Sequence, residues 1–103
     1  MSKKRRAVYR IVTSDGDVWV VGIRRGNVGC HKDAMGWYCL THISSGSLLA
    51  WAVHVTRAAH ALRALAACDL PMVTRDGWSA LPADERAYHK ARIQVAQEVL
   101  YLL

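Results

Sequence analysis

The chain of 103 residues contains no phenylalanine, only two prolines and only three cysteines. Without phenylalanine, tryptophan and tyrosine must fill the aromatic share of the core. A secreted disulfide scaffold normally carries an even and denser set of cysteines than Cys30, Cys39 and Cys68. The cysteine content therefore indicates reduced thiols in a cytoplasmic protein.

We expect neither an export signal nor a membrane-spanning run in this sequence. The basic start of the chain looks like the first region of a signal peptide, but Arg10, Asp15 and Asp17 interrupt the apolar stretch that follows. The longest apolar tract, residues 48–70, contains two arginines and two histidines, which makes it too costly as a simple membrane span. We therefore expect no membrane partner.

Familiar catalytic and metal-binding motifs are absent. The chain has no glycine-rich dinucleotide loop, phosphate loop, nucleophile elbow or His-Glu-x-x-His motif. Residues 30–42 hold cysteines and histidines, which zinc prefers, but Cys39 and His42 are three apart on one strand and would point to opposite faces. The same segment could supply a Cys/His nucleophile with Asp33, although no family signature surrounds it. We expect no enzyme, metal or other cofactor.

Length and charge suggest a small basic domain. With 52% hydrophobic residues, the chain can build one core, and we expect a single domain over residues 8–103. Residues 1–7 are polar and basic and are expected to form a flexible arm. Fourteen Lys plus Arg against eight Asp plus Glu give a net charge of +6. This charge favours anionic partners.

Two runs of β-branched and aromatic residues, 8–13 and 18–23, flank the strongest turn signal in the chain. Asp15 and Gly16 suit a type I′ turn, which predicts a β-hairpin with these two residues as its loop. In that register Val12 pairs with Trp19, and both faces of the hairpin are apolar. Such a hairpin is covered by helices on both sides or buried against another subunit, so a homodimer is a further expectation.

The middle of the chain predicts two more strands. Residues 24–29 have turn chemistry and residues 30–36 show no periodicity, so both are expected to be a loop. Residues 37–43 form a third strand. Residues 48–54 fit either a fourth strand or the start of the following helix, and the β-branched residues around position 55 favour a strand followed by a helix.

Two helices complete the prediction. Thr56 is a good N-cap for the alanine-rich segment 57–68, residues 70–81 are irregular, and Pro82 opens the last helix. The apolar stripe of that helix comprises Tyr88, Ala91, Val95, Val99 and Leu102. Because strands precede helices, the predicted class is α+β: a small antiparallel sheet of about four strands with two helices packed on it.

Ten basic residues are candidates for binding an anionic partner. Those of the arm and hairpin could form one phosphate-neutralising surface, and three others fall about a turn apart on the first helix. The candidates are Lys3, Lys4, Arg5, Arg6, Arg10, Arg24, Arg25, Arg57, His60 and Arg63. The bland alternatives are a solubilising tail and a solvated helix face.

Aromatic residues on the expected strands have two interpretations. Exposed among arginines, they would form a stacking platform for single-stranded nucleic acid. Packed inward, they would replace the missing phenylalanines in the core. The residues concerned are Trp19, Trp37, Tyr38 and Trp51.

One stretch resembles a known group of proteins in outline. Residues 36–46, Gly-Trp-Tyr-Cys-Leu-Thr-His-Ile-Ser-Ser-Gly, followed by Thr-Arg-Ala-Ala-His-Ala-Leu at 56–62, resemble the layout of short proteins carried by phages and other mobile elements. Such proteins include small DNA-binding modules and inhibitors of host defence complexes of the anti-CRISPR kind. The chain is therefore expected to bind nucleic acid through its basic arm and hairpin end. The alternative is an inhibitor that binds a host nucleoprotein complex through protein contacts.

Overall fold

The computed structural model describes residues 5–102 and shows an antiparallel sheet followed by helices. The five strands are β1 (Arg5–Thr13), β2 (Gly16–Arg25), β3 (Val28–Lys32), β4 (Tyr38–His42) and β5 (Ser47–Ala52), and they lie in the sheet in chain order. The helices are α1 (Val55–Ala67), α2 (Arg75–Ala80) and α3 (Ala83–Leu102). The predicted α+β class is confirmed, with a fifth strand and a third helix added.

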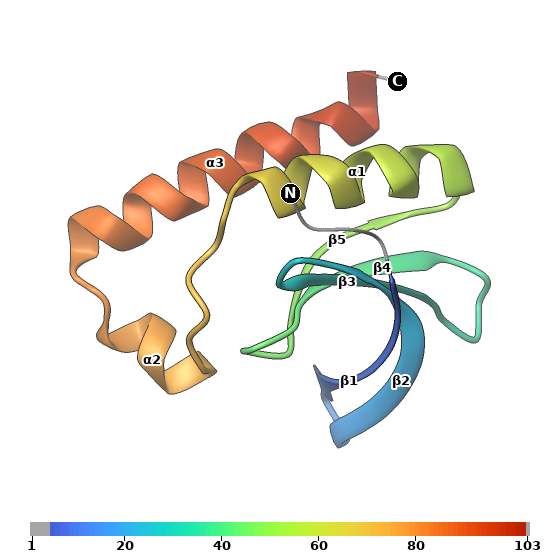
Figure 1. The fold of residues 1–103 in the computed structure, drawn as a ribbon, viewed down its shortest axis with the longest axis horizontal. Coiled ribbons are helices and arrows are strands. Elements are labelled where there is room, and N and C mark those ends of the chain that lie inside the picture. The colour runs from blue at the N-terminus through green and yellow to red at the C-terminus, as the bar shows by residue number, and fades with distance from the viewer. Residues whose placement is uncertain (1–4, 103) are drawn as a thin grey trace.

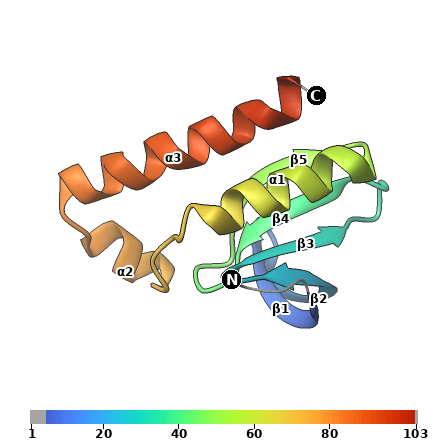
Figure 2. The ribbon, with the colours of Figure 1, turned by 45° about the horizontal axis from the view of Figure 1, so that its top comes forward.

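Helices α1 and α3 lie on one side of the sheet. Helix α1 runs across β3, β4 and β5, and α3 lies beside α1 (Figure 1). The turned view in Figure 2 shows β1 and β2 on the other side of the sheet from α3. Among the described residues, no helix is both long and apolar enough to cross a membrane.

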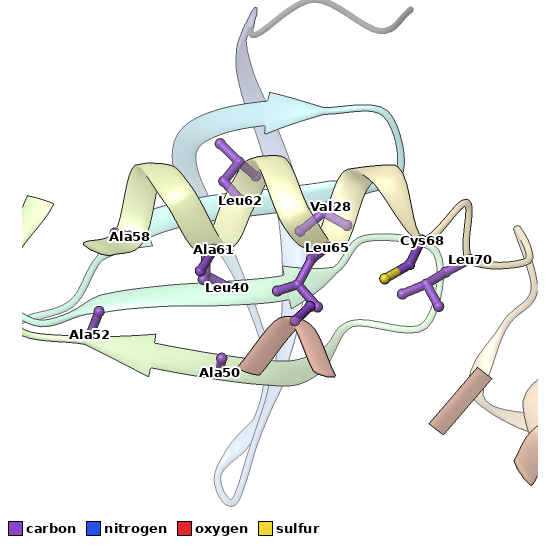
Figure 3. Packing of buried hydrophobic residues seen from close by; sticks show 11 residues of the cluster. Val28, Leu40, Ala50, Ala52, Ala58, Ala61, Leu62, Leu65, Cys68 and Leu70 are labelled. Atoms are coloured by element: carbon purple, nitrogen blue, oxygen red, sulfur yellow. The ribbon is translucent and has the colours of Figure 1, made fainter. Parts of the chain in front are cut away.

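The core lies between α1 and the sheet. The buried residues of α1 are Ala58, Ala61, Leu62 and Leu65, at the i, i+3, i+4 and i+7 spacing of one helix face. Leu65 and Ala61 lie over Leu40 of β4, which is also fully buried (Figure 3). The small alanine side chains at this interface let α1 approach the strands closely, and helix and sheet together form one core.

The β1–β2 hairpin covers part of the other face of the sheet. Tyr9 on β1 is 3% exposed, and its ring packs against the backbone of Gly29 on β3. The end of β1 is fixed to the β4–β5 turn, where the backbone N–H of Val12 donates to the carbonyl of Gly46 at 2.9 Å. The hairpin thus bends beneath its own sheet, and the sheet covers the part of the hairpin's inner face that carries Tyr9.

The hairpin exists as predicted, but its loop and register differ. Thr13 pairs with Gly16, so the loop is Ser14 and Asp15, and Trp19 pairs with Arg10 instead of Val12. A type I′ turn at Asp15 and Gly16 needs positive φ at both residues, and only Gly16 has one. Because the register differs by two residues, every side chain still lies on its predicted face.

Three local predictions are wrong. Residues 28–32, expected in a loop, form β3, because Asn27 and the left-handed Gly26 (φ 58°) make a turn only two residues long. Helix α1 starts at Val55 with His54 as N-cap, so Thr56 is inside the helix. Helix α2 falls in the segment expected to be irregular, where the hydroxyl of Thr74 accepts a bond from the Gly77 N–H at 3.1 Å.

The described side chains of the predicted apolar stripe on α3 face outward, and the last two residues of the stripe, Val99 and Leu102, are not among them. Pro82 precedes α3 as expected, but Tyr88 and Val95 are 57% and 65% exposed. Ala96 is buried instead and Ile93 packs on the core. The sequence of α3 has apolar residues on more than one face, so periodicity alone does not identify the buried face. Packing against α1 buries the face that carries Ile93 and Ala96.

Candidate nucleic-acid interface

Eight of the ten predicted basic residues are described, and they lie on β1, β2 and α1. Lys3 and Lys4 lie outside the described residues. Arg5 and Arg6 are the first residues of β1, so the strand includes part of the segment predicted to be an arm. Arg10 is further along β1, and the hairpin's other basic pair ends β2. The remaining three are on α1: Arg57, His60 and Arg63.

The two arginines that end β2 have different roles, because successive strand residues point to opposite faces. Arg24 is half-buried and donates from Nε and Nη2 to the carbonyl of Gly26 at 3.1 and 2.9 Å. Its guanidinium therefore holds the β2–β3 turn. Arg25 faces the other way, toward α1, and lines two depressions of the surface.

The first depression is a groove of about 390 Å³ between β2, β3 and the N-terminal half of α1. Its apolar lining includes Val21, Ile23, Val55 and Leu62. Its cationic lining is Arg25 from β2, Lys32 from β3 and Arg63 from α1, and none of the described residues that line it is acidic. We call this feature the basic groove.

Arg25 and Arg63 also line a second depression of about 680 Å³ next to the first. It lies over the β2–β3 turn and the C-terminal half of α1, and it includes one acidic residue, Asp69. Two predicted site residues that are 38 positions apart in the sequence are thus brought to the boundary between two hollows. A charged group of a ligand that lies between Arg25 and Arg63 is therefore accessible from both depressions.

Other predicted residues are not gathered into the basic groove. Arg5 pairs with Arg24 and lies on the opposite face of the sheet. Residues three apart on a helix advance by 300°, so Arg57, His60 and Arg63 rotate around α1. Only Arg63 lines the groove, and His60 is exposed to solvent elsewhere.

Lys32 is the member of the groove that sequence reasoning missed. It ends β3, a strand with glycine, cysteine and histidine in place of the usual β-branched residues. Its ammonium lies 5.7 Å from the centre of the Tyr38 ring, its cross-strand partner. The sequence signal that could have found Lys32 is the Gly26-Asn27 pair, because a two-residue turn there predicts a strand on each side of it.

The outer face of the hairpin adds exposed apolar residues beside arginines. Val8, Trp19 and Val21 are 63%, 68% and 61% exposed. Arg6 and Arg10 share this face with Val8, because residues two apart on a strand point to the same face. Arg10 also pairs with the carboxylate of Asp17 at 3.3 Å, and both side chains are exposed. We call this surface the outer hairpin face; it comprises Arg6, Val8, Arg10, Asp17, Trp19 and Val21.

The cysteine and histidine cluster on the inner face forms a structural network. The Tyr9 hydroxyl lies 3.4 Å from Nδ1 of His31, and the Cys39 thiol donates to Oδ2 of Asp33 at 3.8 Å. Burial and the Asp33 charge raise the pKa of the Cys39 thiol, and burial lowers the pKa of His31. A protonated thiol is a poor nucleophile, so this geometry does not favour covalent catalysis.

His42 is the centre of a second buried network, and it lies on the opposite face from Cys39, as predicted. Its Nδ1 is 2.6 Å from the Ser45 hydroxyl, and its Nε2 is 2.9 Å from the Pro71 carbonyl. The Asn27 amide also lies 3.0 Å from Nε2. Both ring nitrogens of His42 therefore have polar partners, and the contact of Nε2 with the Pro71 carbonyl joins the sheet to the segment before α2.

A metal site is not assembled from the residues that the structure describes: nowhere among them do three His, Cys, Asp or Glu side chains gather in a way that could hold an ion. Trp37 and Trp51 stack on each other at 6.2 Å between ring centres, at the end of the sheet away from the hairpin loop.

The chain matches no protein-family model, and no curated protein and no solved structure matches it significantly, so its function is inferred from the arrangement of its own residues.

Proposed function

We propose that this protein is a non-enzymatic cytoplasmic module that binds nucleic acid, and that the basic groove is its main phosphate-binding surface. The observation that carries the proposal is the convergence of Arg25, Lys32 and Arg63 from three different elements on one groove. Side chains held by β2, β3 and α1 keep fixed separations, which suits a polymer whose phosphates are regularly spaced.

The chemistry of the groove agrees with this ligand class. Cationic side chains neutralise phosphates and release counterions, which supplies most of the free energy of sequence-independent binding. An apolar lining beneath the cations can accept the sugar and base surfaces of the same polymer. Residues 1–30 hold seven of the fourteen basic residues but only two of the eight acidic ones, so the N-terminal part of the chain attracts polyanions over longer distances.

The test is binding of a fluorescent oligonucleotide across a salt series by wild-type protein and by the Arg25→Ala/Arg63→Ala variant. Each lost phosphate contact should lower the slope of log affinity against log salt by about 0.7 for single strands, so the double variant should lose about 1.4. The matched control is Arg75→Ala/Lys90→Ala, which removes the same charge from α2 and α3. Equal losses in both variants, or no binding by the wild-type protein at low salt, would rule out the groove as the phosphate site.

One observation favours the alternative, inhibition of a nucleoprotein complex by protein binding. The stacked rings of Trp37 and Trp51 are 40% and 54% exposed, and Leu48 on the same face is 54% exposed. An apolar patch of this kind suits a protein partner. If this alternative is correct, capture from nuclease-treated host lysate will depend on Trp51 and not on Arg25 and Arg63.

A further inference from the structure

The outer hairpin face exposes an aromatic side chain that the fold does not use. Trp19 is 68% exposed, more than Trp37 or Trp51, and Val8 and Val21 beside it are both more than 60% exposed. The inner face of the same hairpin carries the buried Tyr9, so the hairpin is held in place without help from Trp19. Large apolar side chains left in contact with water next to one another mark a binding surface.

The charges around Trp19 indicate what binds there. Arg10 is its direct cross-strand partner, and Arg6 is opposite Ile23 further along the same face. Asp17 neutralises Arg10 only in part, because an exposed ion pair contributes little in water. Cations next to an exposed indole match a ligand that carries flat rings and negative charges.

This face is continuous with the basic groove. One face of β2 carries every second residue of the strand from Trp19 onward, namely Trp19, Val21, Ile23 and Arg25. The last three of these line the groove. Six residues of strand at about 3.3 Å per residue give a path of about 20 Å from Trp19 to Arg25. That length corresponds to about six stacked nucleotides of one strand, or fewer when the strand is extended.

We infer that the ligand of this surface is single-stranded nucleic acid, with a base stacked on Trp19 and the following phosphates on the basic groove. This inference rests on the proposed function and specifies its substrate class. In a duplex the base faces are covered by their neighbours, so an indole on a strand surface cannot reach them. In a single strand every base offers a free face, whatever the sequence.

The same face is a poor surface for a second copy of the chain. A two-fold contact across Trp19 would bring Arg6 and Arg10 of both copies together, and each copy carries a net charge of +6. A polyanion removes this repulsion, whereas a second copy increases it. Charge complementarity therefore selects the nucleic acid as the occupant.

The experiment compares Trp19→Ala, Trp19→Phe and the control Trp51→Ala, which removes an exposed indole from the other face. Binding is measured with an oligothymidylate of about ten nucleotides and with a duplex of the same length. Wild-type protein should prefer the single strand, Trp19→Ala should weaken that binding about tenfold, and Trp19→Phe should restore most of it. The salt slope should stay unchanged in all three variants, because none of them removes a charge.

The outcomes separate the inference from the proposed function. Equal binding of both polymers, or unchanged affinity in Trp19→Ala, overturns the single-strand assignment and leaves the phosphate groove in place. Failure of the wild-type protein to bind either polymer overturns both. Light scattering that shows a dimer in wild-type protein and a monomer in Trp19→Ala assigns the face to self-association and also overturns the inference. Circular dichroism confirms that each variant is folded.

Discussion

The ring of Tyr9 lies so close to Gly29 that a β-carbon on the glycine would come within 2.5 Å of the ring atom Cζ. The two residues belong to β1 and β3, which are not neighbours in the sheet. Their contact is therefore a packing contact between the bent hairpin and the underside of the sheet. It determines the position of the outer hairpin face, because Tyr9 and the exposed side chains alternate along the same strand.

Gly29→Ala should therefore destabilise the protein. The added methyl group displaces the Tyr9 ring, and we expect a loss of about 1–3 kcal/mol in the free energy of unfolding, measured with urea. In a Tyr9→Ala background the methyl group has room, so the same substitution should cost much less. Strictly additive effects of the two substitutions would show that the contact does not hold the hairpin.

The sequence predicted the elements with strong local signals. The hairpin, the strand around Leu40 and the alanine-rich helix were all recognisable from residue type and periodicity. The missed strand β3 has little β-propensity and forms because Val28 and Cys30 pack under α1. The curl of the hairpin depends on the contact between Tyr9 and Gly29, which no local pattern records.

The candidate site was predictable only in part. Arg25 and Arg63 were both identified from charge, but their proximity depends on how α1 crosses the sheet. Arg24 was indistinguishable from Arg25 in the sequence, although it bonds to the turn at Gly26 and leaves the groove to its neighbour. Residue type thus indicated the chemistry of the site, whereas strand alternation and helix placement determined its members.

Stability should fall as the pH drops from 7 toward 5. Burial lowers the pKa of His42, and the hydrogen bond that its ring donates to the Pro71 carbonyl opposes this only partly. The unfolded chain therefore takes up a proton first, at about pH 6.5, and stability present above that pH is lost as the pH falls toward the folded pKa. The slope can reach about 1.4 kcal/mol per pH unit for each such histidine.

Urea unfolding at several pH values measures this slope. His42→Gln should flatten it, whatever its effect on stability at neutral pH, and His31 should contribute to the slope in the same direction because burial lowers its pKa as well. The matched control is His60→Gln, which replaces an exposed histidine outside both buried networks. An equal slope in wild-type protein and in His42→Gln would show that His42 does not titrate on unfolding.

Asp33 should suppress the reactivity of Cys39. After burial, the negative charge of Asp33 is the next cause of the raised pKa of this thiol, which donates to Oδ2. Asp33→Asn removes the charge and keeps Oδ1, the acceptor for the backbone N–H groups of Met35 and Trp37. Alkylation of Cys39 at neutral pH should become about two- to tenfold faster.

Peptide-level mass spectrometry resolves that rate from those of the other cysteines. Cys68 is the internal control, because its thiol lies on the far side of the core and donates to the Ala64 carbonyl. Its alkylation rate should be the same in both proteins. A rate increase at Cys68 of the same size would indicate general loosening of the fold instead of a change in the charge next to Cys39.

Asp17 should limit the affinity of the outer hairpin face for nucleic acid. Its carboxylate is 3.3 Å from Nε of Arg10 and competes with a phosphate for that guanidinium. Asp17→Asn frees Arg10 and removes a negative charge from the face, so single-strand affinity should rise at low salt. If Arg10 gains one phosphate contact, the slope against log salt becomes steeper by about 0.7.

The control for this last prediction is Asp15→Asn, which removes the same charge from the hairpin loop. No ion pair to an arginine is found for Asp15 in the described part of the chain, so its loss should raise affinity through the net charge alone and leave the slope nearly unchanged. The free energy of unfolding should change by less than about 1 kcal/mol in either variant, because an exposed ion pair contributes little to stability. Identical slopes for Asp17→Asn and Asp15→Asn would mean that Arg10 does not contact the nucleic acid, and the phosphate path would then run from Trp19 to Arg25 without it.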